Sequence, residues 1–502
     1  MILKPLLQTL YQNHACSSDL SLDLEKEVRA FLCNQPLNLE GLIESEMLWN
    51  SFLSEEKIAQ NWKILLVLNL LGYFSQSQMQ SLFKKVQFLL HQPWNQHSTY
   101  LRALVALNQF FVGMPVADSG LQLLQNGAAL IELQEYRSWQ ALPYLPCHTE
   151  LATLICILAH LTQRQELQQQ VLKMARWQLN TLDADGFPLV GLFSQEKNGQ
   201  IGQHLLWNYL FFYAMSQLYE QEPFAAIAQA QWGYLQNLLP SNHLSISPLI
   251  PLLERLIQAQ STQLPKVNNQ EIQLSDQIFD PTTSLVGYRH PLHHAVCTLH
   301  GEHTGLGCFR SADVRVINYG PQYLPLDNCQ GFGIEGNSLS DQGVRKSTIH
   351  LHPQGFLAKG CVRLVDQPGA SGSKGKFRGI WLETEQELKD QRLKIHVNFL
   401  SLNGWEGVIF SFFVKAQQCL LESGQILNPK TFERYEGRVA GISFLGATGK
   451  IQLNSFPYTG TMQVIPLEGE NSFWGADFLV AYLLDPKQRQ YQWQLLPSVL
   501  TH

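Results

Sequence analysis

The sequence predicts two domains of different class: an all-helical, α/α toroid-like domain over residues 1–262 and a large antiparallel β-sandwich over residues 285–502. A chain of 502 residues is too long for one core, because single cores stop growing near ~250–300 residues. The apolar spacing also changes, from a helical period before residue 260 to a period of two after residue 285. Between them, residues 263–284 are polar with two prolines, which is typical of a linker.

The first half consists of successive amphipathic stretches of helical length. In residues 56–74, Ile58, Trp62 and Leu65 lie along one side, with Asn69 as the only polar residue in the stripe. Similar stretches cover 76–91, 97–112, 148–162, 165–181, 203–220 and 224–239. Helices joined by short loops stack as antiparallel hairpins, and the lack of a repeated motif favours a closed toroid over a solenoid.

The second half shows strand patterns separated by glycine-rich turns. Residues 392–399 alternate polar and apolar side chains without a slip, which predicts a half-buried strand. Residues 408–414 are almost entirely apolar and predict a more deeply buried strand. Many short strands with no helix between them indicate an antiparallel sandwich.

Composition excludes several classes of function. A net charge of −6 argues against unspecific nucleic-acid binding. There is no P-loop, GxGxxG, GxSxG or kinase signature, which disfavours phosphoryl transfer, dinucleotide chemistry and the α/β-hydrolase mechanism.

Nine scattered cysteines without a CxxC pair are typical of free thiols in a reducing compartment. With no signal peptide and no apolar run of ~20 residues, we expect a cytoplasmic protein without a membrane span; specialised secretion stays open.

One group of candidate residues follows a loop with an Asp-Gly turn, Asp185-Gly186. The helix after it carries His204, Trp207, Asn208 and Tyr209, and residues four apart, such as 204 and 208, share a helix face. These side chains could transfer protons and bind a polar ligand. Alternatively, the aromatic residues pack in the core and the Asp-Gly pair is an ordinary turn.

Histidines form the second group. His148 stands at the start of an apolar helix, and five more cluster at the entry to the β half: His290, His293, His294, His300 and His303. Imidazole is a common zinc ligand, so His293, His300 and His303 are the candidate ligands if a metal is bound. The spacing matches no zinc motif and HExxH is absent, so we expect neither metal nor organic cofactor, with zinc as the alternative.

A third feature is a basic stretch over residues 345–378, with seven Lys and Arg against the single acid Asp366. In a protein that is acidic overall, such a stretch could attract an anionic polymer. It could equally be a solvated loop, since its SGSKGKFRG segment has a flexible composition.

In domain order, helical toroid followed by β-sandwich, the chain resembles the heparinase II/III-like and alginate-lyase polysaccharide lyases. In that family a loop with a DG turn precedes a helix bearing the catalytic Tyr, as Asp185-Gly186 precedes Tyr209 here. The family's β domain opens with a histidine-bearing strand pair and a turn at glycine; here residues 300–305 lead to Asn318-Tyr319-Gly320.

The resemblance implies β-elimination on a uronic acid, in an anionic polysaccharide or oligosaccharide, with the cleft between the two domains. Tyr209 would be base or acid and His303 its partner, while His148 or Asn208 would neutralise the uronate carboxylate. The substrate-binding residues would be His204, Trp207, His300 and Arg310, with Arg310 acting as a clamp.

Two rival functions stay open. Leu210 follows Tyr209 where the family often has His, and Cys147-His148 stands where it commonly has Asn; no Asp follows His303. These departures favour a catalytically inactive carbohydrate-binding or scaffold protein of the same architecture. A glycoside hydrolase is the third possibility, and it would need two carboxylates about 5–10 Å apart, drawn from Asp183, Asp185, Glu196 and Glu220.

Overall fold

The computed structural model describes about half of the helical part and most of the β part of the chain. The described residues are 58–70, 76, 80, 96–113, 145–193, 200–219, 223–238, 249–260, 274–280, 284–299, 305–323, 337–340, 348–366, 378–400, 408–431, 433–438, 441–456, 460–467, 469, 473–485 and 487–500. They belong to two compact units. One contains the long helices, and the other contains all the strands together with Asn180–Ile201.

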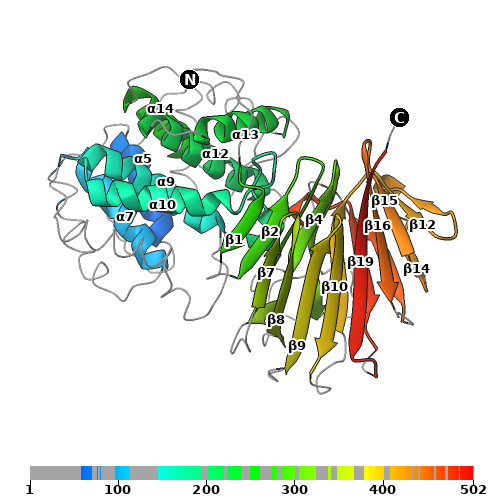
Figure 1. The fold of residues 1–502 in the computed structure, drawn as a ribbon. Coiled ribbons are helices and arrows are strands. Elements are labelled where there is room, and N and C mark those ends of the chain that lie inside the picture. Colours follow the sequence, from blue (N-terminus) through cyan, green and yellow to red (C-terminus); the bar gives the residue numbers. More distant parts are fainter. Residues whose placement is uncertain are drawn as a thin grey trace, which may run out of the picture. The chain divides into compact units, whose positions relative to one another are not determined.

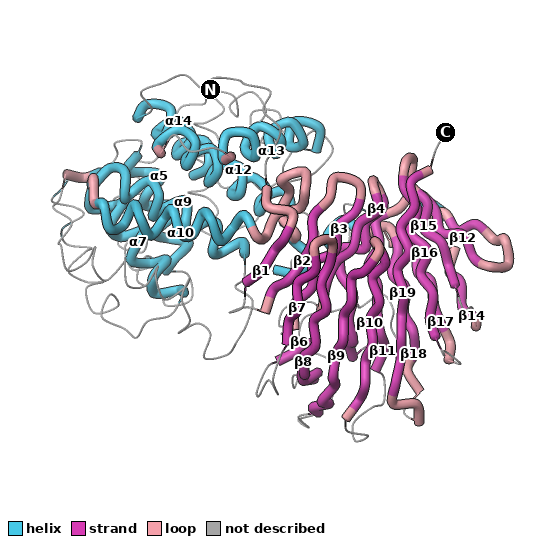
Figure 2. Tube along the Cα trace, viewed as in Figure 1, coloured by secondary structure: helices cyan, strands magenta, loops and turns pink. Residues whose placement is uncertain are grey.

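Figures 1 and 2 show the helices of the helical unit. These are α5 (Ile58–Leu70), α7 (Gln96–Phe111), α9 (Leu145–Thr162), α10 (Gln165–Leu179), α12 (Gln200–Leu218), α13 (Phe224–Leu238) and α14 (Leu249–Gln260). The bounds of these helices match the periodic stretches 97–112, 148–162, 165–181, 203–220 and 224–239 within three residues, and α5 lies inside the stretch 56–74. The stretch 76–91 lies almost wholly outside the described residues, so the closed toroid stays a prediction.

The polar residue in the first stripe is explained by a buried contact. Asn69 on α5 is 7% exposed, and its amide donates a hydrogen bond to Asn108 Oδ1 on α7. Asn108 in turn donates to Leu104 O at 2.9 Å and to Trp62 O at 3.3 Å. A buried amide is tolerated when it is hydrogen-bonded, so Asn69 joins two packed helices instead of facing solvent.

The β unit contains two antiparallel sheets (Figure 2). The nine-stranded sheet has the order β1 (Gln277–Asp280), β2 (Leu285–Arg289), β3 (His293–Thr298), β4 (Gly307–Ser311), β5 (Val314–Tyr323), β11 (Val408–Lys415), β18 (Phe478–Leu483), β17 (Met462–Pro466), β14 (Tyr435–Gly437). The ten-stranded sheet has the order β13 (Ile426–Leu427), β12 (Gln418–Leu421), β15 (Gly441–Leu445), β16 (Gly449–Phe456), β19 (Gln490–Val499), β10 (Arg392–Phe399), β9 (Arg378–Lys389), β8 (Gly355–Asp366), β6 (Asn337–Ser340), with β7 (Thr348–His352) also paired to β8. β1 lies within residues 263–284, so the end of the expected linker forms an edge strand.

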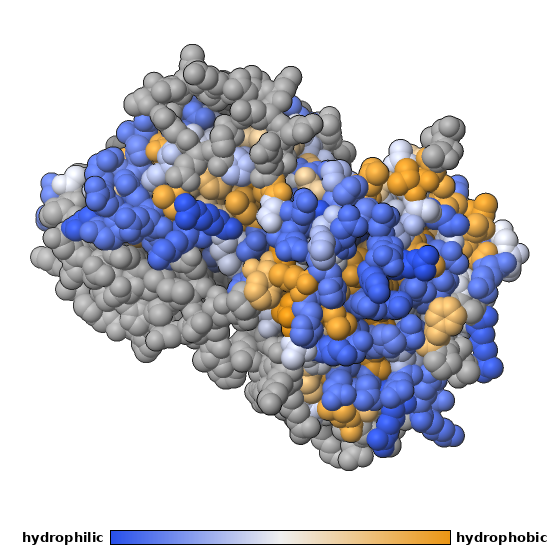
Figure 3. All heavy atoms as spheres, viewed as in Figure 1, coloured by the Kyte–Doolittle hydropathy of each residue, from blue (hydrophilic) through white to orange (hydrophobic). Residues whose placement is uncertain are grey.

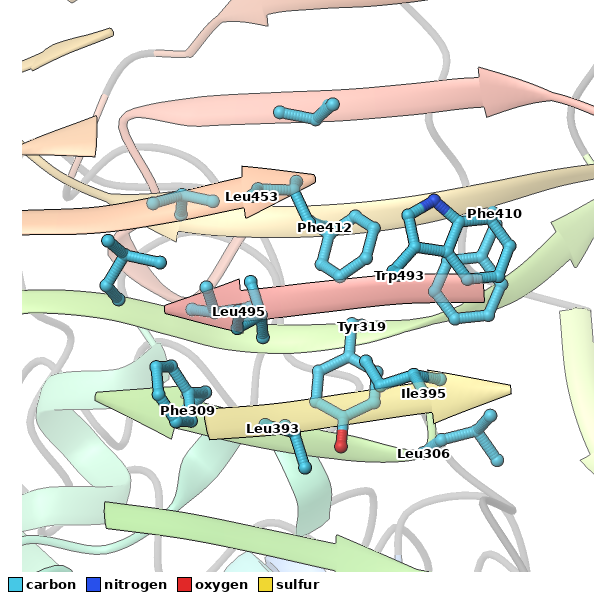
Figure 4. Close-up of a cluster of buried hydrophobic side chains, with 14 of the residues drawn as sticks. Leu306, Phe309, Tyr319, Leu393, Ile395, Phe410, Phe412, Leu453, Trp493 and Leu495 are labelled. Atoms are coloured by element: carbon cyan, nitrogen blue, oxygen red, sulfur yellow. The ribbon is translucent and has the colours of Figure 1, made fainter. Parts of the chain in front are cut away.

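Side chains from both sheets form one apolar core between them (Figure 4). The Phe410 ring stacks on Trp493 with ring centroids 3.9 Å apart, which joins β11 to β19. Burying a residue such as Phe or Leu contributes ~1.5–3 kcal/mol, so this cluster supplies much of the unit's stability. A buried polar contact crosses the same core, because Tyr319 donates its hydroxyl hydrogen to Gln386 Oε1.

Residues 180–193 are part of the β unit although they stand between two helices in the sequence. Leu182 and Pro188 form an isolated antiparallel bridge, and Gly186 turns the chain between them at φ +82°, a conformation that favours glycine. The short helix α11 (Val190–Phe193) follows, and Asn318 donates a hydrogen bond to Gly191 O at 2.6 Å. Val190 packs with Phe413 and Trp474 in a second, smaller apolar cluster.

Among the described residues, no helix is both long enough and apolar enough to cross a membrane.

Candidate functional site

The central element of the candidate site is α12, a helix that is apolar on most of its circumference. Such a helix is expected to be buried, and its polar side chains then need an explanation. His204 is 2% exposed and Asn208 is fully buried; Trp207 and Tyr209 are each 3% exposed. His204 lies three residues before Trp207 and four before Asn208, so these three side chains share one face of the helix.

Several polar atoms on this face have no hydrogen-bond partner in the described structure. They are both ring nitrogens of His204, the indole Nε1 of Trp207 and the amide Nδ2 of Asn208. A buried unsatisfied polar group costs ~1–3 kcal/mol, and native proteins contain few of them. Three such residues on one helix face therefore mark a place where a polar ligand, or bound water, would be stabilised.

Burial sets the charge of this face. It lowers the pKa of His204 from 6.5 to about 3, so the ring is neutral at physiological pH and offers one N–H donor and one acceptor. Asn208 Oδ1 accepts a hydrogen bond from Gln231 Nε2 on α13 at 2.7 Å. This contact fixes the amide plane and leaves the Asn208 N–H donors free. With the Trp207 indole, the face presents mainly donors and no charge.

Tyr209 points to different neighbours from those of Asn208. Its hydroxyl donates a hydrogen bond to Glu254 Oε1 on α14 at 3.1 Å. Its ring stacks on Tyr213 at 5.7 Å and lies 5.3 Å from Trp232. Burial, followed by the negative charge of Glu254, raises the pKa of Tyr209 well above 10. The phenol is therefore protonated, which suits a proton donor and disfavours a base.

His148 is held on α9 by contacts to α10. A hydrogen bond joins its Nδ1 to the side-chain amide of Gln178, with the two nitrogen atoms 2.9 Å apart. The ring lies 5.0 Å from Trp177, and burial lowers the pKa of His148 to about 4. His148 is thus a second neutral, oriented imidazole in the helical unit.

Arg310 on β4 is already bound within the β unit. It pairs with Asp185, lies 3.4 Å from Asp183, and donates from Nε to Ala312 O at 2.6 Å. Asp183 is 2% exposed, and its Oδ1 also accepts the backbone N–H groups of Asp185 and Phe187 at 2.9 Å each. A guanidinium held by two carboxylates has little capacity left to clamp a substrate.

Arg310 belongs to a row of basic side chains that crosses the nine-stranded sheet. Arg289, His294, Arg310 and Arg315 stand opposite one another on β2, β3, β4 and β5. Directly opposed like charges are unfavourable, so the row requires the carboxylates that the 180–189 loop supplies. Arg289 also anchors this loop, donating from Nε to Leu182 O at 2.8 Å.

The same contacts bear on the hydrolase candidates. Burial raises the pKa of Asp183 above its usual value, against the opposing effect of Arg315 and Arg310. Asp185 is paired with Arg310 and lies 3.8 Å from Arg315. Both carboxylates hold the loop to the sheet, and Glu196 and Glu220 lie outside the described residues.

The histidine cluster is described only in part. His300 and His303 lie outside the described residues. His293 stacks on His290 with ring centroids 4.3 Å apart, and burial, followed by His290, lowers the pKa of His293 to about 4. No group of three or more His, Cys, Asp or Glu side chains in the described part of the chain is placed to hold a metal ion.

The partners that orient the candidate residues are not predicted from the sequence. They are Glu254, Gln231 and Gln178, which contact Tyr209, Asn208 and His148 and lie on three different helices. Glu254 carries a recognisable signal, since it is the one acid in the apolar sequence of α14 and is 2% exposed. The two glutamines give no such signal, because glutamine is frequent throughout this chain.

No family model and no curated protein matches the chain. Among solved structures, it is similar to a heparinase III, with a TM-score of 0.42 and 12% identity over 96% of this chain and 75% of that one. It is also similar to a protein of glycosyl hydrolase family 38 from Enterococcus faecalis, with a TM-score of 0.28 and 8% identity over 79% of this chain and 62% of that one.

Proposed function

We propose that the protein cleaves a uronic-acid-containing glycan by β-elimination. The observation that carries this proposal is the uncharged, donor-rich face of α12, next to a protonated tyrosine. A uronate carboxylate needs hydrogen-bond donors, and the unpartnered Trp207 and Asn208 groups are donors without a bound acceptor. Neutralising that carboxylate is what makes the adjacent C5 proton removable, because negative charge then develops on it in the transition state.

The proposed reaction assigns one task to each residue. Asn208, with His148 or His204, binds the carboxylate as charge develops. A base, for which His303 is the proposal from the sequence, takes the C5 proton, and the C5–H electron pair forms the C4=C5 double bond. The C4–O bond breaks, and the departing oxygen receives a proton from Tyr209. Glu254, hydrogen-bonded to Tyr209 at 3.1 Å, orients the phenol for this transfer.

One observation favours the rival, a non-catalytic protein of the same architecture. The four candidate side chains on α12 are at most 3% exposed, and the Tyr209 hydroxyl is already bound to Glu254. A substrate must displace whatever covers them before it can react. If that does not happen, the unpartnered groups are binding sites for water and the protein is a scaffold or lectin-like protein.

The deciding experiment follows the ultraviolet absorbance of the unsaturated uronate produced by β-elimination. Purified protein is incubated with alginate, heparan sulfate, hyaluronan and pectate, and reducing ends are measured in parallel. We expect absorbance to rise with at least one polymer, and Tyr209→Phe to abolish the rise. Tyr219→Phe is the matched control, because Tyr219 lies one residue beyond the C-terminal end of α12 and bonds only to Cys156 O among the described contacts of its hydroxyl.

The two measurements separate the three functions. New reducing ends without absorbance would replace the lyase by a hydrolase, and Asp183→Asn and Asp185→Asn would then test its acids. No change in either signal across the four polymers would contradict catalysis and support the scaffold protein. Equal loss of activity in Tyr209→Phe and Tyr219→Phe would contradict the role given to Tyr209.

A further inference from the structure

The outer face of the ten-stranded sheet carries several amide side chains among its outward-facing positions. On β10, β19 and β16, every second side chain points away from the core, as expected for strands covered on one side. The outward positions include six amides: Asn398, Gln490, Gln492, Gln494, Gln452 and Asn454. In Figure 3 the front of the β unit is correspondingly dominated by hydrophilic residues. Amides are uncharged and can both donate and accept hydrogen bonds, so these positions offer neutral hydrogen-bonding groups between the charged ones.

Two of these amides, Asn398 and Gln490, line a groove with a volume of about 430 Å³ on the same face. Its outward-facing polar lining comes from four neighbouring strands and includes Lys359, Glu383, Glu385, His396, Asn398 and Gln490. The strand register aligns His396 with Glu385 on one side and with Gln492 on the other. Gln492 in turn stands opposite Phe456 on β16. One row of side chains therefore leads from the groove to an aromatic ring.

Phe456 is 46% exposed, although a phenyl ring gains little from contact with water. A flat apolar ring next to amides matches the two kinds of surface on a sugar ring, whose C–H face is apolar and whose edges carry hydroxyls. An amide both donates and accepts, so it can bind a hydroxyl in either role. Gln490, Gln492 and Gln494 repeat this group along β19 at a spacing of ~7 Å.

The charges of the face select between neutral and acidic ligands. Lys359 pairs with Glu385 at 2.6 Å, and Lys394 pairs with Glu387 at 3.5 Å. Glu383 accepts a hydrogen bond from Asn398 at 3.0 Å. The groove itself is lined by one lysine and two glutamates, so it carries no surplus of positive charge to attract a polyanion.

From this arrangement we infer that the outer face of the ten-stranded sheet binds a neutral oligosaccharide. The sugar ring packs on Phe456, and the hydroxyls bond to Gln492, Gln490 and His396. This surface is separate from the residues of the proposed β-elimination. Either activity can therefore fail without the other.

The test applies the full-length protein to an immobilised array of neutral and uronate-containing oligosaccharides, followed by calorimetric titration with the best neutral hexasaccharide. We expect neutral glycans to bind, and Phe456→Ala and Gln492→Ala each to weaken binding about tenfold. Two matched controls remove the same side chains elsewhere: Phe279→Ala, a ring 44% exposed on β1, and Gln425→Ala between β12 and β13. Both should stay within about twofold of the wild type.

Three results would overturn the inference: no neutral glycan above background, binding of uronate-containing glycans alone, or binding unchanged by Phe456→Ala and Gln492→Ala. Loss of binding in all four variants would do the same, because it would show a general effect of substitution. Lyase activity is measured on the same preparations. Its presence or absence leaves this result unaffected.

Discussion

Replacing His204 by leucine tests whether the candidate site carries an energetic cost in the absence of ligand. The imidazole is 2% exposed and neither ring nitrogen has a partner in the described structure. Leucine is of similar size and has no polar atom to desolvate. Because an unsatisfied buried polar group costs ~1–3 kcal/mol, His204→Leu should raise the free energy of unfolding at pH 7 by about 1 kcal/mol or more.

The pH dependence of the free energy of unfolding gives a second expected difference between the variant and the wild type. Burial lowers the pKa of His204 from 6.5 to about 3, so the unfolded chain takes up a proton at a higher pH than the folded protein does. The stability from the neutral imidazole is complete above pH 6.5 and is lost as the pH falls towards 3. At pH 5 the loss is roughly 2 kcal/mol, from 1.36 kcal/mol per pH unit. The variant lacks this loss, so its advantage should widen by about that amount.

Urea unfolding followed by far-ultraviolet circular dichroism at pH 7 and pH 5 measures both effects. His160→Leu is the control, because its ring is only partly buried and should show smaller changes at both pH values. A His204→Leu protein less stable than the wild type at pH 7, or one whose advantage does not grow at pH 5, would refute the reasoning. Either result would mean that the imidazole is satisfied in the folded protein and serves packing.

Further substitutions test the β unit. Arg310→Met removes one of the two guanidinium groups near the buried Asp183 carboxylate and also the pairing with Asp185, so it should cost ~1–3 kcal/mol in urea unfolding. Arg315→Met, whose side chain is 38% exposed and lies farther from both carboxylates, should cost under about 1 kcal/mol. Equal effects would contradict the assignment of the anchor to Arg310. Tyr319→Phe should cost ~1–3 kcal/mol by leaving Gln386 Oε1 unsatisfied, and adding Gln386→Leu should recover part of that loss. Additive losses in the double variant would contradict the pairing.

The sequence predicts the strand and helix elements well where one face is buried. Residues 392–399 form β10 with the expected alternation of exposed and buried side chains, and Val408–Lys415 forms β11, buried over seven of its eight positions. Alternation and apolar runs are direct consequences of burial on one or both faces of a sheet. The spacing of the apolar residues is therefore a reliable guide to where these strands lie.

The local sequence pattern does not predict that residues 180–193 belong to the β unit. Asp183 and Gly186 mark a turn, but nothing nearby in the sequence shows that this turn binds Arg289 and Arg310, more than a hundred residues away. The same holds for Tyr209 and Glu254, which are 45 residues apart. Pairings of this kind depend on tertiary packing, which composition and spacing do not encode.

The predicted site residues fall into groups with different outcomes. His204, Trp207, Asn208 and Tyr209 share α12 and are buried, but their catalytic roles stay predictions. Polar residues in an apolar helix gave the signal, because their burial is costly unless they are used. Arg310 contacts Asp183 and Asp185, because the loop at 180–189 places both aspartates next to it.

The central claim, that the α12 face binds a uronate carboxylate, is tested most directly by calorimetric titration of the Tyr209→Phe protein. The ligands are oligouronates from the polymer cleaved in the absorbance assay, or from alginate if none is cleaved, and the same oligomers after reduction of their carboxyl groups to alcohols. We predict that the acidic form binds at least about tenfold more tightly, and that Asn208→Ala in the Tyr209→Phe background removes the difference. Equal affinity for the two forms, or no binding of the acidic form, would contradict the claim.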